Sequence, residues 1–389
     1  SLSIQSALDS QLEKFTPVDV NLYKTAYLPE SYVSSYSGKT IYNTEEQIED
    51  SKHPVSYTLE TNGYDMNNLK DIVEIPIYAI PEWTMKTSLG DYSEKAMQQF
   101  SMLAYDTPET VIKISDYNKV AALYGNEQYS LNDDEYMVLC DFEQMMNIRD
   151  EALKQNSDIE INGKTYHAKY KECKDGFVLM STSNMNAGII LVSDNFEIKK
   201  ENTEQYFLAA NYNAETEEEK IELEKVLSGE VDSELFDNLS DKGINLEGTT
   251  KISLTEASKG LSTIIIFIAI YLGIVFLIAS SAILALKQLT ESSDNKQRYT
   301  ILRKIGCDEK MINEALFRQI FIFFMMPLTL AIVHSIFGIK FILSILAALA
   351  SPDELLPSII VTAVIIGAIY GLYFLATYFG SKNIIKEEE

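Results

Sequence analysis

The feature that most limits what this chain can fold into is an uncharged run of 26 residues, Leu261–Leu286. As an α-helix the run is about 39 Å long, which exceeds the ~30 Å hydrocarbon core of a bilayer. A helix buried in a soluble protein would carry a polar stripe on one side, and this run shows none. The sequence therefore predicts a membrane-spanning helix at 261–286.

Two further apolar runs predict a second and a third span. The second covers about 320–339 and is bounded by the charged residues Arg318 and Lys340. It contains Pro327, which membrane helices tolerate because neighbouring helices satisfy the backbone groups that proline frees. The third covers about 358–379.

Three small residues lie four apart in the third predicted span: Ala363, Gly367 and Gly371. Such a ridge lets two helices approach closely, so it predicts a helix-packing face. The alternative is that these residues are tolerated in a membrane helix without a packing role.

Acidic residues are concentrated in the first two thirds of the chain. Residues 1–258 hold 21 Lys/Arg and 47 Asp/Glu, a net charge of −26, whereas 259–389 hold 11 and 10, a net charge of +1. A nucleic-acid partner is excluded because phosphate binding needs a positive surface. The predicted fold class is a membrane protein, with an α+β extracytoplasmic domain at 1–258 and a three-helix transmembrane domain at 259–389.

The basic residues of the short loops predict how the spans are oriented. Segment 287–318 carries seven Lys/Arg, whereas segment 340–357 carries only Lys340. Because loops rich in Lys and Arg stay in the cytoplasm, 287–318 and the C-terminus are predicted to be cytoplasmic and 1–258 extracellular. The protein would then be a multi-pass component of the plasma membrane, in contact with membrane lipids.

An exported domain of this size needs a signal or a membrane segment before it. Residues 1–20 contain neither. We therefore expect at least one further membrane helix upstream.

The acidic segment shows signals for both strands and helices. Alternating residues on either side of Asn162-Gly163 predict a β-hairpin over 158–170. Strands are also predicted at 176–180 and 188–192. Helices are predicted at 93–105, 116–124, 133–155 and 215–228.

No catalytic or metal-binding pattern is visible. The three cysteines, Cys140, Cys173 and Cys307, and the three histidines lack metal-ligand spacing. Cys140 and Cys173 pair if their side of the membrane is oxidising, or they remain two free thiols. We therefore expect a protein that is not an enzyme and binds no cofactor of its own.

Segment 287–318 contains a short amphipathic element. Its apolar side chains are interleaved with basic ones, and Gly306 is placed to end the helix. One interpretation is an interfacial helix on lipid headgroups, and the other is a docking site for a soluble partner. The element comprises Arg298, Tyr299, Ile301, Leu302, Arg303, Lys304, Ile305 and Gly306.

Three stretches resemble a known family: Tyr271–Ser280, Lys287–Glu291 and Arg298–Gly306. Together they resemble the FtsX-like permease domain of ABC transporters, most closely the bacitracin-export, antimicrobial-peptide-resistance type of Gram-positive bacteria. The resemblance covers about residues 255–380.

The resemblance implies a permease subunit that works with a separate ATPase subunit, which binds the ATP. It places the coupling to that ATPase at the element Arg298–Gly306, and it implies further permease helices upstream. It also implies a sensor histidine kinase as a partner, and a role in export of, resistance to or sensing of antimicrobial peptides. The alternative function is a non-transporting FtsX-like regulator of an extracellular cell-wall hydrolase.

The ligand outside the cell has two candidates. The net charge of −26 favours cationic peptides, because an acidic surface attracts them over long distances. The family resemblance also implies lipid-linked cell-wall precursors. An acidic surface that serves only solubility is the alternative to both.

Overall fold

The computed structural model describes residues 2–34, 37–99, 104–155, 157–227, 234–346 and 352–386. The chain divides into two compact units. We call Ser10–Ser258 the α+β domain, and residues 1–9 with 259–389 the helical unit. A mixed sheet with helices in the first and three long apolar helices in the second confirm the predicted fold class.

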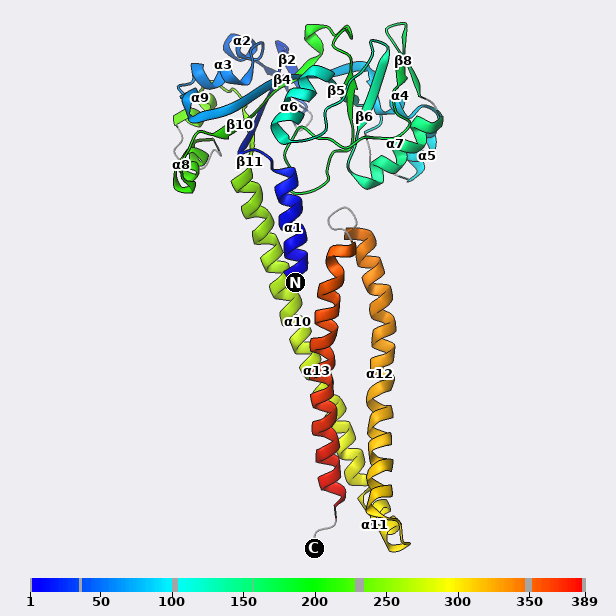
Figure 1. The fold of residues 1–389 in the computed structure, drawn as a ribbon. Coiled ribbons are helices and arrows are strands. Elements are labelled where there is room, and N and C mark those ends of the chain that lie inside the picture. Colours follow the sequence, from blue (N-terminus) through cyan, green and yellow to red (C-terminus); the bar gives the residue numbers. More distant parts are fainter. Residues whose placement is uncertain are drawn as a thin grey trace. The chain divides into compact units, whose positions relative to one another are not determined.

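The described part of the α+β domain is built on one nine-stranded sheet (Figure 1). Strands β5 and β9 run parallel, as do β6 and β8, and the other neighbours are antiparallel. A separate two-stranded sheet joins β2 (Ser31–Val33) and β3 (Thr40–Tyr42). The nine-stranded sheet has the order β11 (Glu247–Thr250), β1 (Val20–Thr25), β10 (Thr203–Tyr212), β4 (Leu69–Thr84), β5 (Pro108–Lys113), β9 (Ile189–Val192), β6 (Glu135–Leu139), β8 (Lys164–Ala168) and β7 (Asp158–Ile161).

Both faces of this sheet are covered by other elements of the domain. Successive residues of a strand point to opposite faces, so neighbouring residues of one strand pack into different cores. On β10, Phe207 packs into one core and Leu208 into another. The first core holds α6 (Ile114–Tyr124), and the second holds α3 (Val55–Thr61) with α8 (Glu217–Leu227) and α9 (Glu234–Asp241). The central strands are therefore apolar at consecutive positions, as a doubly covered sheet requires.

The far end of the sheet carries two further clusters. One surrounds Trp83, the chain's single tryptophan, which is fully buried and packs edge-on against Tyr136. The other joins α7 (Glu143–Gln155) to α4 (Met85–Leu89) and α5 (Ser93–Gln99). The described part of the domain also contains α2 (Glu45–Asp50), the end of α1 (Leu2–Phe15) and three short 3-10 helices. The 3-10 helices are η1 (Met66–Asn68), η2 (Gly90–Tyr92) and η3 (Lys200–Asn202).

Some local predictions for this domain are confirmed. The hairpin forms with Asn162 and Gly163 at its turn, where both have positive φ (53° and 73°). Helices α6 and α8 and strand β9 lie where the pattern predicts them.

Other local predictions are wrong. Residues 133–142 are not helical, because Glu135–Leu139 form β6 and pair with β9 and β8. Residues 176–180 form no strand; their backbone bonds to side chains, as where Tyr124 Oη donates to the carbonyl of Val178. Helix α5 ends at Gln99, and of the predicted remainder 100–103 lie outside the described residues.

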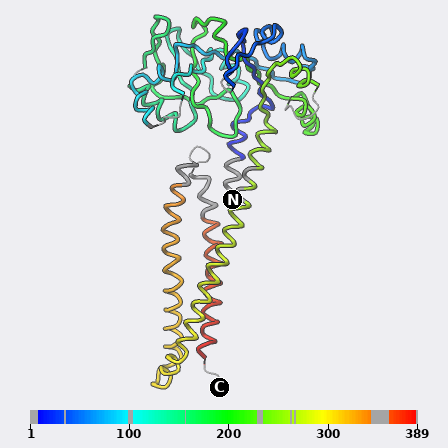
Figure 2. The backbone as a smooth tube through the Cα atoms, turned by 180° about the vertical axis from the view of Figure 1, so that it is seen from behind, coloured from blue at the N-terminus to red at the C-terminus, as the bar shows by residue number. Residues whose placement is uncertain are grey.

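The helical unit contains α10 (Lys251–Asp294), α11 (Lys296–Lys304), α12 (Glu309–Leu346) and α13 (Pro352–Ile385). Figure 2 shows α10, α12 and α13 as the three long helices. Each is long and apolar enough to cross a membrane. Pro327 lies inside α12.

Helix α10 begins before the predicted span. The hydroxyl of Thr250 accepts a hydrogen bond from the backbone N–H of Ser253 at 3.1 Å, which is the geometry of an N-cap. The helix then continues without interruption to Asp294, so it is roughly 66 Å long.

Helices α12 and α13 pack through aromatic rings. Phe317 meets Phe374 and Tyr378 edge-on at ring-centroid distances of 5.5 and 5.6 Å. Tyr370 Oη donates to the carbonyl of Phe324 at 2.9 Å. Most other apolar side chains of the three helices are exposed: only 6%, 11% and 6% of their most apolar windows are buried. That surface suits lipid or further membrane helices.

Candidate functional site

The predicted coupling element forms a separate short helix, α11, between α10 and α12 (Figure 1). It ends as its sequence predicts. Gly306 has φ 95°, and the N–H groups of Gly306 and Cys307 bond to the carbonyls of Arg303 and Leu302 at 3.0 Å each. Glycine is favoured there because left-handed backbone strains any residue with a Cβ.

One face of α11 points inward. Tyr299 is only 7% exposed, and its phenol donates to Gln319 Oε1 of α12 at 3.2 Å. Gln319 Nε2 in turn donates to Glu291 Oε1 of α10 at 3.0 Å. Burial, with the nearby carboxylate of Glu291, raises the pKa of Tyr299 above its usual value. The phenol therefore stays a neutral donor that links three helices.

Arg303 is a second anchor of α11. Its Nη1 donates to the carbonyl of Ile385 at the end of α13 at 2.9 Å. The same guanidinium forms an ion pair with Glu309, the first residue of α12. Through Tyr299 and Arg303, α11 is bonded to α12 and α13, and it is linked to α10 through Gln319 of α12.

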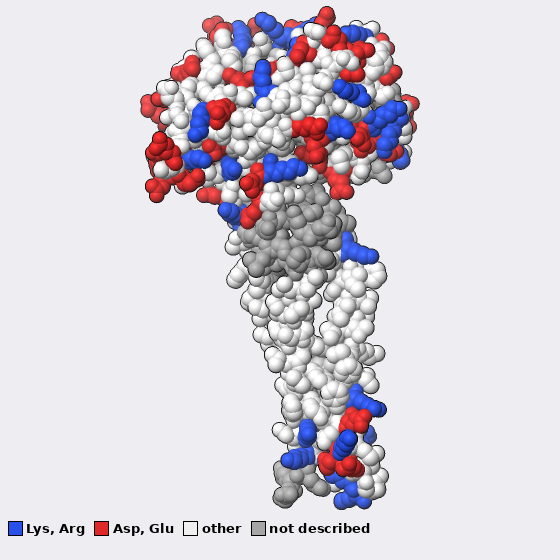
Figure 3. Space-filling view, viewed as in Figure 1, with Lys and Arg blue, Asp and Glu red and all other residues white. Residues whose placement is uncertain are grey.

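The opposite face of α11 is exposed and apolar. Ile301, Leu302 and Ile305 are 53%, 36% and 71% exposed. Arg298 and Lys304 are exposed beside them. Figure 3 shows charged side chains gathered at this end of the helical unit and an uncharged band along the three long helices. We call Ile301, Leu302 and Ile305 the outward face.

The structure thus divides the predicted coupling residues into two groups. Tyr299 and Arg303 hold α11 in place, whereas Arg298, Ile301, Leu302, Lys304 and Ile305 are available to a partner. Sequence reasoning missed Glu291 and Gln319, which complete the inward chain. The only signal for them is that both are polar residues near the ends of apolar runs.

The small-residue ridge of α13 is open. Ala363 and Gly367 are exposed, and a Cβ added at Gly367 or Gly371 would meet nothing within 4 Å. The ridge therefore contacts neither α10 nor α12 where the structure describes them. The packing role of Ala363, Gly367 and Gly371 stays a prediction, and it would require another helix.

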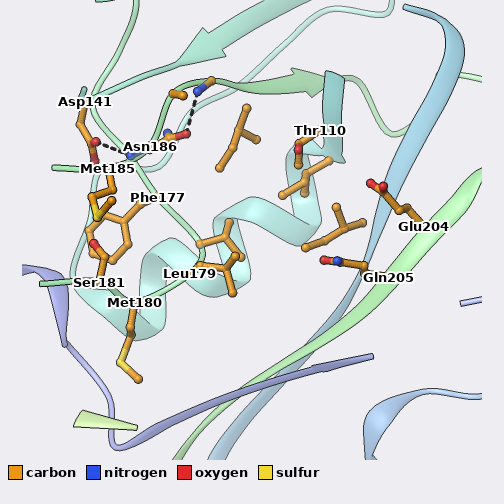
Figure 4. Close-up of a pocket in the computed structure, with 16 residues that line it drawn as sticks. Thr110, Asp141, Phe177, Leu179, Met180, Ser181, Met185, Asn186, Glu204 and Gln205 are labelled. Atoms are coloured by element: carbon orange, nitrogen blue, oxygen red, sulfur yellow. Dashed lines mark hydrogen bonds between the residues drawn. The ribbon is translucent and has the colours of Figure 1, made fainter. Parts of the chain in front are cut away.

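The α+β domain contains a cavity of ≈ 530 Å³ (Figure 4), and no sequence pattern predicts it. Its floor is apolar, with Ile77, Ile112 and Phe177 among the lining residues. Asp141 and Asn186 lie at one end, and Glu204 and Gln205 at the other. Two carboxylates and no Lys, Arg or His line it, so it favours a ligand that is apolar with a positive charge.

Asp141 is the buried acid of this cavity. Its Oδ1 accepts the backbone N–H of Asn186 at 2.8 Å, and its side chain is almost entirely covered. Burial raises the pKa of Asp141 to about 6, against the effect of that hydrogen bond. The carboxyl therefore changes charge close to physiological pH.

Comparisons with known proteins match parts of this chain. No family model matches it. It is 26% identical over 251 residues to the bacitracin export permease protein BceB of Bacillus subtilis, covering 60% of this chain and 35% of that protein. It is 30% identical over 138 residues to BceB of Halalkalibacterium halodurans, covering 35% and 20%. It is 25% identical over 114 residues to the ABC transporter permease protein YxdM of Bacillus subtilis, covering 29% and 18%.

These relatives confirm the resemblance to ABC-transporter permeases of the bacitracin-export type. The matched segments span about a third of the relatives' length or less. The three apolar helices and this similarity to transporter permeases support a membrane protein.

Replacing Arg303 by Met should loosen α11, because it removes the guanidinium and keeps the length of the side chain. Hydrogen bonds to a charged group contribute about 1.5–3 kcal/mol each, so amide exchange in α11 should rise roughly 10- to 100-fold. Hydrogen exchange of the full chain in detergent, read by mass spectrometry, measures this. Arg298→Met is the matched control and should leave exchange unchanged; equal exchange in both variants would contradict the anchoring role.

Replacing Asp141 by Asn should stabilise the protein at high pH. In the folded state the pKa of Asp141 is about 6, above the usual ~3.9 of an unfolded chain. The contribution of the protonated Asp141 to the free energy of unfolding is therefore complete below about pH 4 and is lost as pH rises through 6. Asp141→Asn should therefore raise the free energy of unfolding by about 3 kcal/mol at pH 8 and by little at pH 4.

Urea unfolding of the full chain in detergent, followed by Trp83 fluorescence, measures this difference. Asp106→Asn removes the same charge from an exposed position and should change stability by less than about 0.5 kcal/mol at either pH. A gain that is the same at pH 4 and pH 8 would rule out the raised pKa.

Proposed function

We propose that this chain, a relative of bacitracin-export permeases, belongs to the membrane-spanning subunit of an ABC transporter and docks a separate ATPase through α11. The observation that supports this most is the division of α11 into two faces. One face is bonded to α12 and α13 directly and to α10 through Gln319, and the other offers exposed apolar side chains.

An exposed apolar face on an otherwise charged helix usually marks a contact with another molecule. The side chain of Ile305 is 71% exposed to solvent. The exposed side chains of Arg298 and Lys304 lie on the same helix and do not cover it. A short helix of this kind fits a groove in a partner, with its apolar side chains as anchors and the basic ones at the rim.

The inward bonds give the docked partner a mechanical connection. A displacement of α11 acts on α12 and α10 through Tyr299 and Gln319, and on α13 through Arg303. ATP binding and hydrolysis on the partner would then be transmitted to the spans without any cofactor bound by this chain. Helix α10 carries the displacement furthest, because it is a single helix from Lys251 to Asp294.

Ile305→Asp and Leu302→Asp should each abolish ATPase association, because they place a charge at the centre of an apolar contact. Loss of an interface anchor typically costs at least about 2 kcal/mol, so the Kd should rise at least 30-fold. Co-purification of the ATPase with the complete permease, and the permease-stimulated ATP hydrolysis rate, measure this.

Ile221→Asp is the matched control, since Ile221 is an exposed isoleucine on α8 of the α+β domain. It should bind the ATPase normally. Unchanged association in the two α11 variants would refute docking, and a weaker attachment of α11 to lipid vesicles would then favour the interfacial helix.

We further propose that α11 is cytoplasmic and that the α+β domain is extracellular, in the plasma membrane of a Gram-positive bacterium. The seven Lys/Arg of segment 287–318 support this orientation. The ATPase requires it as well, because ATP is available in the cytoplasm.

Cysteine labelling in intact cells should show the orientation. In a background with Cys173→Ser and Cys307→Ser, a membrane-impermeant maleimide should label Lys164→Cys, in the exposed hairpin, and leave Asp294→Cys unlabelled until the cells are opened. Both positions are exposed in the structure, so access to the side chain does not differ. The reverse pattern would contradict the orientation.

For the extracellular ligand we propose a cationic peptide. The net charge of −26 in residues 1–258 would attract it over long distances. The cavity between Asp141 and Glu204 would then take a basic and an apolar side chain. Lipid-linked cell-wall precursors carry negative phosphates, which the carboxylates of the cavity oppose.

Binding of a cationic peptide should weaken as salt rises, because screening shortens the reach of the acidic surface. Titration of fluorescently labelled polymyxin into the full chain in detergent should show at least a tenfold higher Kd at 0.5 M than at 0.05 M NaCl. Glu204→Gln should weaken binding, whereas Glu218→Gln, which removes an exposed acid from α8, should not. A Kd that is independent of salt would contradict electrostatic attraction.

A further inference from the structure

We propose that Cys140 and Cys173 form an intramolecular disulfide when the α+β domain meets a disulfide oxidant. Cys140 directly follows β6 and is fully buried. Cys173 is partly exposed and lies in the irregular segment 169–188. The two residues are 33 positions apart in the sequence, and the fold brings them together.

Backbone hydrogen bonds hold the two cysteines next to one another. The N–H of Cys140 donates to the carbonyl of Lys174 at 3.1 Å, and the N–H of Lys174 donates to the carbonyl of Val138 at 2.9 Å. The N–H of Cys173 donates to Asp150 Oδ1 of α7 at 2.7 Å. Both backbones are therefore fixed by neighbours other than the thiols themselves.

The two cysteines lie in the same part of the core. Cys140 belongs to an apolar cluster with Met145 and Ile148 of α7, and Cys173 packs against that cluster. An isolated parallel bridge between Leu139 and Lys174 places the two cysteines on adjacent backbone segments. A disulfide needs Cα atoms about 4.4–6.8 Å apart, and neighbouring hydrogen-bonded strands lie about 4.7–4.9 Å apart. The hydrogen-bonded segments that carry Cys140 and Cys173 therefore have a spacing that suits the bond.

A buried positive charge favours the thiolate form that the reaction needs. The hydrogen bond from Cys173 and the nearby guanidinium of Arg149 hold the pKa of the Cys140 thiol below its usual value, although burial opposes them. Arg149 is itself held in place by Glu109, with two bonds of 2.9 and 3.0 Å, and by the carbonyl of Ala187. A neighbouring Arg is one of the features that favour a thiolate.

One molecule of a small disulfide is the oxidant, and it accepts the two electrons that the two protein thiols lose. The partly exposed Cys173 is the thiol that the oxidant can reach, although the neighbouring Cys140 thiol and burial raise the pKa of Cys173. Cys173 loses its proton and attacks one sulfur of the oxidant, which forms a mixed disulfide and releases one thiol. The Cys140 thiolate then attacks the Cys173 sulfur and releases the second thiol. Two protein thiols become one disulfide, and the oxidant takes up the two electrons and two protons.

The bond would connect β6 to the segment that lines the cavity. Asp141 follows Cys140 directly, and Phe177 lies four residues after Cys173; both line the cavity. A cross-link there restricts how far these two walls can separate. The inference depends on neither the ATPase nor the orientation, because it concerns contacts within the α+β domain alone.

The test uses the full chain carrying Cys307→Ser, so that only the two cysteines in question remain. The folded protein in detergent is incubated with glutathione disulfide, denatured in acid, and examined by intact mass and by maleimide labelling. We expect a mass lower by two hydrogens and no reactive thiol. A persistent glutathione adduct, or two reactive thiols, would overturn the proposal.

Two further variants separate proximity from reactivity. With Cys140→Ser added, the adduct at Cys173 should form and persist, because no second thiol can displace the glutathione. With Cys173→Ser added, the buried Cys140 should react at least tenfold more slowly than Cys173 does. If Cys140→Ser fails to fold, the Cys173→Ser variant still decides: rapid modification of Cys140 in it would refute the assigned order of attack.

Discussion

Lipid offers no hydrogen-bond partner to a peptide group, and the last third of this chain is organised by that constraint. Each apolar segment satisfies its backbone inside one long helix, and the polar bonds between helices are confined mainly to one end. Tyr299, Gln319 and Glu291 make one chain of bonds there, and Arg303 makes another. These bonds act together with burial, because Tyr299 of α11 also belongs to the apolar cluster that α12 and α13 form.

The α+β domain follows a different rule, since water surrounds it and its sheet is buried on both faces. Its interior holds two ion pairs that are nearly inaccessible to water, Lys24 with Asp50 and Arg149 with Glu109. Both connect the sheet to a helix, and each charge has its counter-charge within hydrogen-bond distance, as buried charges require. Most of the other Asp and Glu side chains lie on the surface of the domain. Its negative charge can therefore act on ligands in solution.

Patterns that depend on neighbours in the sequence could be predicted, and patterns that depend on distant residues could not. The apolar runs, the Asn162-Gly163 turn and the helix end at Gly306 are local, and the structure confirms them. Residues 133–142 were misassigned as helix because a strand buried on both faces is apolar at successive positions, as a buried helix also is. The segment around Gly176 was misassigned as a strand because its backbone bonds reach side chains far along the chain, such as Tyr124. For the same reason, the sequence predicts the residues of α11 but does not show that Tyr299 and Arg303 point inward. The cavity could not be predicted either, because its walls come from six separate segments of the chain.

The burial of Trp83 makes the two halves of this protein separable by spectroscopy. The helical unit contains no tryptophan, and the single indole is enclosed beside Tyr136 and Phe196 in the α+β domain. Intrinsic emission excited at the red edge of absorption therefore comes from one known environment. Quenching or a spectral shift would report on that environment alone, even in a preparation where lipid, detergent and partner subunits surround the remainder of the molecule.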